Sequence, residues 1–88
     1  MITRVTPRKI ERIVASTQRE VAEKLVELRK NQGLTQNQLS EIAGIDRKTI
    51  NRIENGHFSP SVDTLTRLAL ALQVPIGDLL SSQSFDCF

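Results

Sequence analysis

The sequence predicts an all-α protein with one domain, for three reasons. Its 88 residues leave room for one modest hydrophobic core. Glycine and proline are sparse, and tryptophan and tyrosine are absent, which argues against the many turns of a β-sandwich or barrel. Apolar residues recur at helical spacing along most of the chain.

The first helix is expected to begin at Thr6-Pro7, because proline is tolerated at the first helical position. Gly33 is expected to end the helical stretch, because glycine readily takes the left-handed backbone of a C-terminal cap. Between these two points an apolar stripe keeps near-helical spacing: Ile10, Ile13, Val14, Val21, Leu25 and Leu28.

A break in this stretch is predicted near Ser16. Thr17 is followed three residues later by Glu20, the pattern of a capping box, which would start a new helix of ordinary length. A single helix over residues 7–31, about 37 Å long, is the alternative. The expected organisation is a partly helical N-terminal extension over residues 1–16, a helical domain over 17–80 and a mobile tail over 81–88.

The next helix is short and begins after Thr35. The Thr35 side chain is expected to cap it, and Gln38 three positions on completes a capping box. Gly44 ends this helix. Its buried face is predicted to hold Leu39, Ile42 and Ala43.

A third helix follows after a three-residue turn. Asp46 is expected to cap it, with Ile50 and Ile53 on its buried face. Asn55-Gly56 suits a left-handed cap at its end. Two short helices joined by a tight turn form a helix-turn-helix unit.

Two more helices are predicted toward the C-terminus. Ser61 caps the first, and Pro75 lies just past its end. A last short helix spans residues 76–80, and the eight residues after it have no periodic pattern. The inward stripe of the longer helix is predicted to consist of Val62, Leu65, Leu68, Ala69 and Leu72.

The net charge of +2 is unevenly distributed. Residues 1–32 carry eight Lys or Arg against four Asp or Glu, residues 33–60 carry three of each sign, and residues 61–88 carry one Arg against three Asp. The basic excess therefore lies in the N-terminal third. By itself it supports nucleic-acid binding only weakly, because solvated helix faces often carry such patterns.

Other classes of protein are disfavoured by what the sequence lacks. Cys87 is the only cysteine, so an intrachain disulfide and a cysteine-built zinc site are excluded. No apolar run approaches the roughly 18–20 residues that span a bilayer. No catalytic constellation, phosphate loop or dinucleotide motif is present. We therefore expect a soluble intracellular binding protein without enzymatic activity, metal or cofactor.

An ordered set of motifs runs from about Arg19 to Leu80, and the set is specific at this spacing although each member is common. Its members are Leu28-Arg29, Gly33-Leu34-Thr35-Gln36, Leu39, Ala43-Gly44-Ile45, Ile50, Ile53-Glu54-Asn55-Gly56, Pro60, Leu65, Leu68-Ala69, Ala71-Leu72 and Leu79. With it the sequence resembles the Cro/cI-type helix-turn-helix family of prokaryotic and phage regulators, also called the xenobiotic-response-element family. The resemblance implies a five-helix, lambda-repressor-like DNA-binding domain in a cytoplasmic, nucleoid-associated regulator, more often a repressor.

The resemblance also implies that the helix over residues 46–55 enters the major groove of DNA. A groove about 12 Å wide accepts one helix, and side chains near the helix's N-terminal end then reach base edges. Arginine can bond two guanine acceptors, lysine can donate to guanine, and threonine offers a hydroxyl and a methyl group. Four residues match the family's base-reading positions: Arg47, Lys48, Thr49 and Arg52.

A second group of residues is expected to contact phosphates or to position the base readers. In the family that this sequence resembles, a glutamine at the position of Gln36 reaches a backbone phosphate and supports the first base reader, aided by the N–H groups of the helix start. The other members of this group are Thr35, Asn37, Asn51 and Asn55.

The resemblance further pairs Arg29 with Glu54 in a partly buried ion pair that fixes the DNA-reading helix on its scaffold. A bidentate arginine–carboxylate geometry would suit this structural task. Two independent surface charges are the alternative interpretation.

One small domain covers about half of a typical operator, so we expect a homodimer on palindromic double-stranded DNA. Its dimer surface is expected to use the C-terminal residues Ile76, Leu79, Leu80, Phe85 and Phe88, or alternatively the N-terminal stripe of Ile10, Ile13 and Val14.

Two other functions stay open at this point. An antitoxin would repress its own operon and bind a toxin protein through one of the terminal extensions. A protein-interaction module without DNA binding is the third interpretation, and the retained Arg47, Lys48 and Arg52 count against it.

Overall fold

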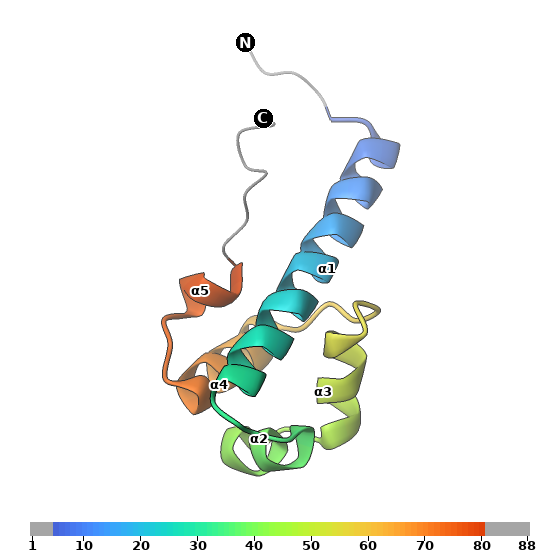
Figure 1. Cartoon of the computed structure of the whole chain (residues 1–88). Coiled ribbons are helices and arrows are strands. Elements are labelled where there is room, and N and C mark those ends of the chain that lie inside the picture. Colours follow the sequence, from blue (N-terminus) through green and yellow to red (C-terminus); the bar gives the residue numbers. More distant parts are fainter. Residues whose placement is uncertain (1–4, 81–88) are drawn as a thin grey trace.

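The computed structural model describes residues 5–80, and the regular structure in this range is entirely helical (Figure 1). The helices are α1 (Pro7–Asn31), α2 (Gln36–Ala43), α3 (Arg47–Glu54), α4 (Val62–Leu72) and α5 (Ile76–Leu80). The predicted all-α fold is confirmed. The predicted mobile tail, with its dimer candidates Phe85 and Phe88, lies outside the described residues.

Helix α1 is continuous, so the predicted break near Ser16 is wrong. Its start is the expected one, because the Thr6 side chain accepts a hydrogen bond from the Lys9 N–H. No glycine or proline interrupts the residues after its first position, and the apolar stripe stays in phase across Ser16. The pattern of Thr17 and Glu20 marks a helix start only where the preceding residues leave the helical conformation, and here they do not.

The hydrophobic core lies between the C-terminal half of α1 and the four shorter helices, which gather around that half in Figure 1. Its buried members come mainly from the predicted stripes: Val21, Leu25, Leu39, Ala43, Ile50, Ile53, Leu65, Leu68, Ala69, Leu72 and Leu79. The N-terminal half of α1 extends past the other helices (Figure 1).

Two residues predicted to face this core do not. Ile42 is 57% exposed and Val62 is 75% exposed. Helix α2 has only eight residues and packs along the line of Leu39 and Ala43, so Ile42 lies to the side of that contact. Val62 is the first residue of α4, where the chain has only just reached the core.

Helix α5 corrects one of the dimer candidates. Leu79 is 1% exposed and belongs to the core, so it is not available as a dimer contact. Ile76 is half-buried against the same core, whereas Leu80 is 40% exposed. The two leucines differ because successive helical residues point about 100° apart, so one fills the core and the next faces outward. Among residues 5–80 no helix is long and apolar enough to cross a membrane.

Candidate nucleic-acid interface

A tight turn after α2 fixes the direction of α3. Gly44 has a left-handed φ of +69°, and its N–H donates to the Ser40 carbonyl over 2.9 Å. The Ser40 hydroxyl in turn donates to the Ile45 carbonyl, a contact that no local sequence pattern indicates. These bonds tie both ends of the turn to one residue of α2 and so hold the two helices at a defined angle.

We expect Gly44→Ala to lower the free energy of unfolding by roughly 1–2 kcal/mol, because the left-handed backbone costs an L-residue about this much. The added Cβ would lie 3.2 Å from Nη1 of Arg67, the far end of an exposed side chain, so crowding adds little. Urea denaturation measures the change. Gly77→Ala is the matched control, since its Cβ meets nothing within 4 Å, and it should not destabilise. Equal midpoints for wild type and Gly44→Ala would contradict the expectation.

Helix α3 begins without a side-chain cap. Asp46 occupies the N-cap position with an extended backbone, but its carboxylate makes no capping hydrogen bond, so the predicted cap is wrong in this respect. Its carbonyl accepts the N–H groups of Thr49 and Ile50. The partial positive charge of the helix start is therefore not offset by a capping carboxylate.

The two faces of α3 are sharply different. Ile50 and Ile53 are 0% and 1% exposed and anchor the helix to the core. Thr49 is half-buried, which makes it the least accessible of the predicted base readers. The exposed polar residues of the helix are Arg47, Lys48, Asn51 and Arg52. The structure thus presents three cationic side chains and one amide on the surface of a short, well-anchored helix.

Helix α2 starts with the predicted capping box. Thr35 Oγ1 accepts a hydrogen bond from the Gln38 N–H over 3.0 Å, and the Thr35 N–H donates to Gln38 Oε1 over 2.9 Å. This prediction is confirmed. The N–H groups of Gln36 and Asn37, in the first turn, have no acceptor within the helix and remain at its positive end.

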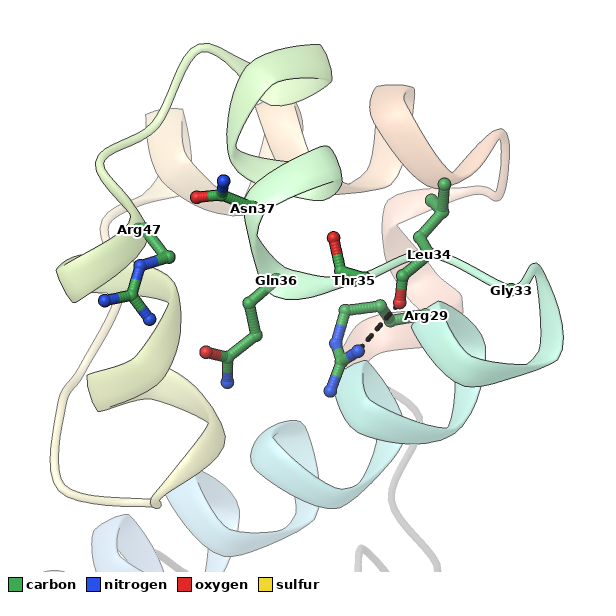
Figure 2. Close-up of a pocket in the computed structure, with 7 residues that line it drawn as sticks. All are labelled: Arg29, Gly33, Leu34, Thr35, Gln36, Asn37 and Arg47. Carbon is green, nitrogen blue, oxygen red and sulfur yellow. Dashed lines mark hydrogen bonds between the residues drawn. The ribbon is translucent and has the colours of Figure 1, made fainter.

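An open hollow of about 510 Å³ lies between the end of α1 and the starts of α2 and α3. Figure 2 shows the Gln36 and Arg47 side chains extending toward this space from α2 and α3, with Arg29 of α1 on the other side. The remaining lining residues are Gly33, Leu34, Thr35 and Asn37. Cationic, amide and helix-start donors around one hollow suit an anion such as a phosphate oxygen.

Arg29 and Glu54 form a bidentate ion pair beside this hollow. Arg29 Nε lies 2.7 Å from Glu54 Oε2, and Nη2 lies 3.0 Å from Oε1. The side chains are only 11% and 5% exposed. Arg29 Nη1 also donates to the Leu34 carbonyl over 2.8 Å, so one guanidinium joins the end of α3 to the loop before α2.

Gln36 takes part in the same network. Its Nε2 donates to Glu54 Oε1 over 2.9 Å. This contact is not predictable from the sequence, because the two residues are 18 positions apart and neither belongs to a local pattern that includes the other. The Glu54 carboxylate therefore accepts hydrogen bonds from three nitrogen atoms of two side chains, and the Gln36 side chain is anchored at the hollow.

The predicted phosphate-contact residues divide into two sets. Thr35, Gln36 and Asn37 line the hollow, whereas Asn51 and Asn55 do not. Asn51 is exposed along α3, and Asn55 is its exposed C-cap. Within residues 5–80 no cluster of three or more His, Cys, Asp or Glu side chains is placed to hold a metal ion.

The part of the chain that forms the core and the hollow is similar to known proteins. A family described as Helix-turn-helix (HTH_3) matches residues 25–79. The chain is 41% identical over 61 residues to the uncharacterized HTH-type transcriptional regulator RghRB of Bacillus subtilis (strain 168), covering 68% of this chain and 44% of that protein. It is 31% identical over 64 residues to the immunity repressor protein of Bacillus phage phi105, covering 73% and 44%. The chain thus spans less than half the length of these two relatives.

The fold also matches solved structures. The restriction-modification controller protein C.AhdI from Aeromonas hydrophila superimposes with a TM-score of 0.71 and 30% sequence identity, over 73% of this chain and 97% of that one.

Proposed function

The chain belongs to the helix-turn-helix family that matches its residues 25–79, and from this premise we propose that it is a transcriptional regulator that binds double-stranded DNA. The observation that carries the proposal is the exposed basic face of α3 beside a hollow at the start of α2. In this arrangement α3 enters the major groove while the hollow receives the DNA backbone.

The roles of the side chains follow from their positions. Arg47, Lys48 and Arg52 are exposed on α3 and read base edges. Thr49 is half-buried and has a short side chain, so it contacts a base edge that lies close to the helix. The Gln36 amide has two N–H donors, so one can bond a phosphate while the other stays on Glu54. The helix-start N–H groups of α2 add to the same phosphate site, with Thr35 and Asn37 beside them.

We further propose a homodimer on a palindromic operator. Two half-sites one DNA turn apart would each receive one α3, which doubles the contacts without enlarging the domain. The similarity to a phage immunity repressor supports repression as the outcome, with the bound dimer acting at the nucleoid in the cytoplasm. Nothing in the relatives described above supports a toxin partner.

Selection of binding sites from a random DNA library tests the proposal. The expected result is a twofold-symmetric site whose half-sites are about 10 base pairs apart, centre to centre. Failure to enrich any sequence, with folded protein at micromolar concentration, would contradict sequence-specific DNA binding.

Binding to the selected site is expected to weaken steeply with salt. A dimer that neutralises about four to eight phosphates should give a log–log slope of about −4 to −7, because each neutralised phosphate releases condensed counterions. Fluorescence anisotropy over roughly 50–300 mM salt measures this slope. DNA of scrambled sequence is the control and should bind more weakly with a comparable salt dependence. A slope near zero on the selected site would contradict the phosphate contacts proposed at the hollow.

A further inference from the structure

An apolar groove of about 260 Å³ lies between the middle of α1 and the segment that leads through α4 to α5. Its apolar lining consists of Ile13, Val14, Val21, Pro60, Leu65 and Leu80. Val14 is 46% exposed and Leu80 is 40% exposed, so the groove opens to solvent along two side chains. The structure thereby brings Leu80 of the predicted C-terminal dimer surface next to Ile13 and Val14 of the alternative N-terminal one.

The apolar stripe of α1 continues beyond this groove. Ile10 lies one turn before Val14 and is 48% exposed. Together with Thr17 and Val21 these residues are spaced by four, three and four positions, the spacing of a seam between two packed helices. Residues 7–12 are all exposed, and this end of α1 extends past the other helices (Figure 1).

This projecting end of α1 would be more stable as a helix with a packing partner. Short isolated helices are marginal in water, and most helical stability in proteins comes from packing an amphipathic face. The arm, defined as residues 7–17 of α1, has such a face, but within it only Ile13 and Ser16 are half-buried and the other residues are exposed.

We propose that a second copy of this chain binds at the groove. The arm of each copy lies in the groove of the other, with the two α1 helices antiparallel and a twofold axis near Val14 and Thr17. A twofold contact of this kind is self-complementary, because Ile10 of one copy meets the groove of its partner and the reverse contact is identical. This contact is the dimer surface of the homodimer proposed above. It rests on the proposed function only for the role of the dimer in DNA binding.

The area of this contact corresponds to a small interface. An arm of eleven residues is roughly 16 Å long and 10–12 Å across, which gives a side surface of roughly 600 Å². If the partner's groove covers half of it, each copy buries roughly 300 Å² of arm and a similar area of groove. Ile13, Val14 and Thr17 belong to both surfaces, so the total buried area stays below roughly 1,200 Å². Interfaces of this size are at the small end of specific ones, which predicts a dimer of modest affinity.

The position of this surface is compatible with DNA binding. In Figure 1 the arm lies at the end of α1 far from α2, whereas the hollow lies beside the start of α2. A partner at the groove therefore leaves the hollow uncovered.

Sedimentation equilibrium of the full chain without DNA, over roughly 1–300 μM, tests the inference. The expected wild-type mass approaches twice 9.9 kDa at the upper concentrations. Val14→Glu places a charge in the groove and should raise the dimer dissociation constant at least tenfold. Thr17→Arg also places a charge in the groove and should raise the dimer dissociation constant in the same way. Thr17 is exposed and polar, so this substitution removes no buried apolar group. It therefore remains informative if circular dichroism shows that Val14→Glu does not fold.

Leu70→Glu is the matched control, because Leu70 is an equally apolar residue, 73% exposed on α4 and absent from the groove lining, and it should leave the dimer intact. A monomeric wild type over the whole range would overturn the inference, as would dissociation caused by Leu70→Glu but not by Thr17→Arg. Loss of the dimer in Phe85→Ser with Thr17→Arg still dimeric would instead assign the interface to the C-terminal segment. Because mass is measured without DNA, a dimer that binds no DNA would contradict only the proposed function.

Discussion

Arg29→Ala is expected to lower the free energy of unfolding by about 3–5 kcal/mol, because removing one partner of a buried ion pair leaves the other charge uncompensated. Glu54 is 5% exposed and, among the bonds described above, would keep the one from the Gln36 amide. The Leu34 carbonyl would also lose its bond from Arg29 Nη1. In a domain of this size each kcal/mol corresponds to roughly 4–8 °C, so the melting temperature should fall by more than about 10 °C.

Thermal and urea denaturation measure this loss, and Arg67→Ala is the matched control. Arg67 also pairs with a carboxylate, Asp63, at 2.9 Å, but the two side chains are 51% and 75% exposed. An exposed pair of this kind contributes only about 0–1 kcal/mol. Equal effects of the two substitutions would show that the Arg29 pair contributes no more than a surface contact. Replacing Arg29 and Glu54 together by Met and Leu should recover much of the loss, since no unpaired charge then remains.

Arg47→Ala is expected to weaken binding to the preferred operator by about 2–6 kcal/mol, because each bidentate base contact contributes about 1–3 kcal/mol and a dimer makes two. Arg47 is exposed in the first turn of α3, where side chains reach deepest into a major groove. The loss should come with relaxed preference at one base-pair position in each half-site.

The measurement is a binding profile of wild type and variant over every single-base change in the operator. Asn37→Ala provides the contrast, because Asn37 lines the same hollow and is proposed to contact phosphate, so it should weaken all sequences alike. If Arg47→Ala also weakens all sequences alike, Arg47 is a phosphate contact, and Lys48, Thr49 and Arg52 carry the specificity.

Local sequence signals predicted most of the fold. The predicted caps at Thr35 and Ser61 form as expected, each with a hydrogen bond from an N–H three residues on, and Thr6 caps α1 in the same way. Gly33 and Gly44 both have a φ of +69° at helix ends, where an L-residue would be strained. These signals could be interpreted from the sequence because the groups that satisfy one another lie within one helical turn.

Predictions that depended on packing between residues far apart in the sequence were less reliable. Leu79 was assigned to a dimer surface because nothing local shows that α5 folds back onto α1 and α4, where this side chain is 1% exposed. The break near Ser16 was predicted from a local pattern, but continuity of the helix depends on the apolar residues on both sides of it. Ile42 has the correct spacing for burial, yet it is 57% exposed, because α2 packs on the core through Leu39 and Ala43.

The same distinction holds for the candidate site. The outward position of Arg47, Lys48 and Arg52 follows from the burial of Ile50 and Ile53 on the opposite face, which the periodicity indicates. The bond between Gln36 and Glu54 joins two helices whose angle depends on the turn at Gly44 and could not be derived from spacing alone. Which bases and phosphates these residues contact stays a prediction.

The bond from Gln36 to Glu54 has a consequence for the entropy of association. A free glutamine side chain loses up to about 1.5–2 kcal/mol of conformational freedom when it is immobilised. Because Gln36 is already restrained by Glu54, and Glu54 by Arg29, much of this loss occurs when the domain folds and not when it meets a phosphate. A variant that stayed folded but released Glu54 would therefore present a more disordered Gln36, and its complexes with DNA would dissociate faster although no contact to DNA had been removed.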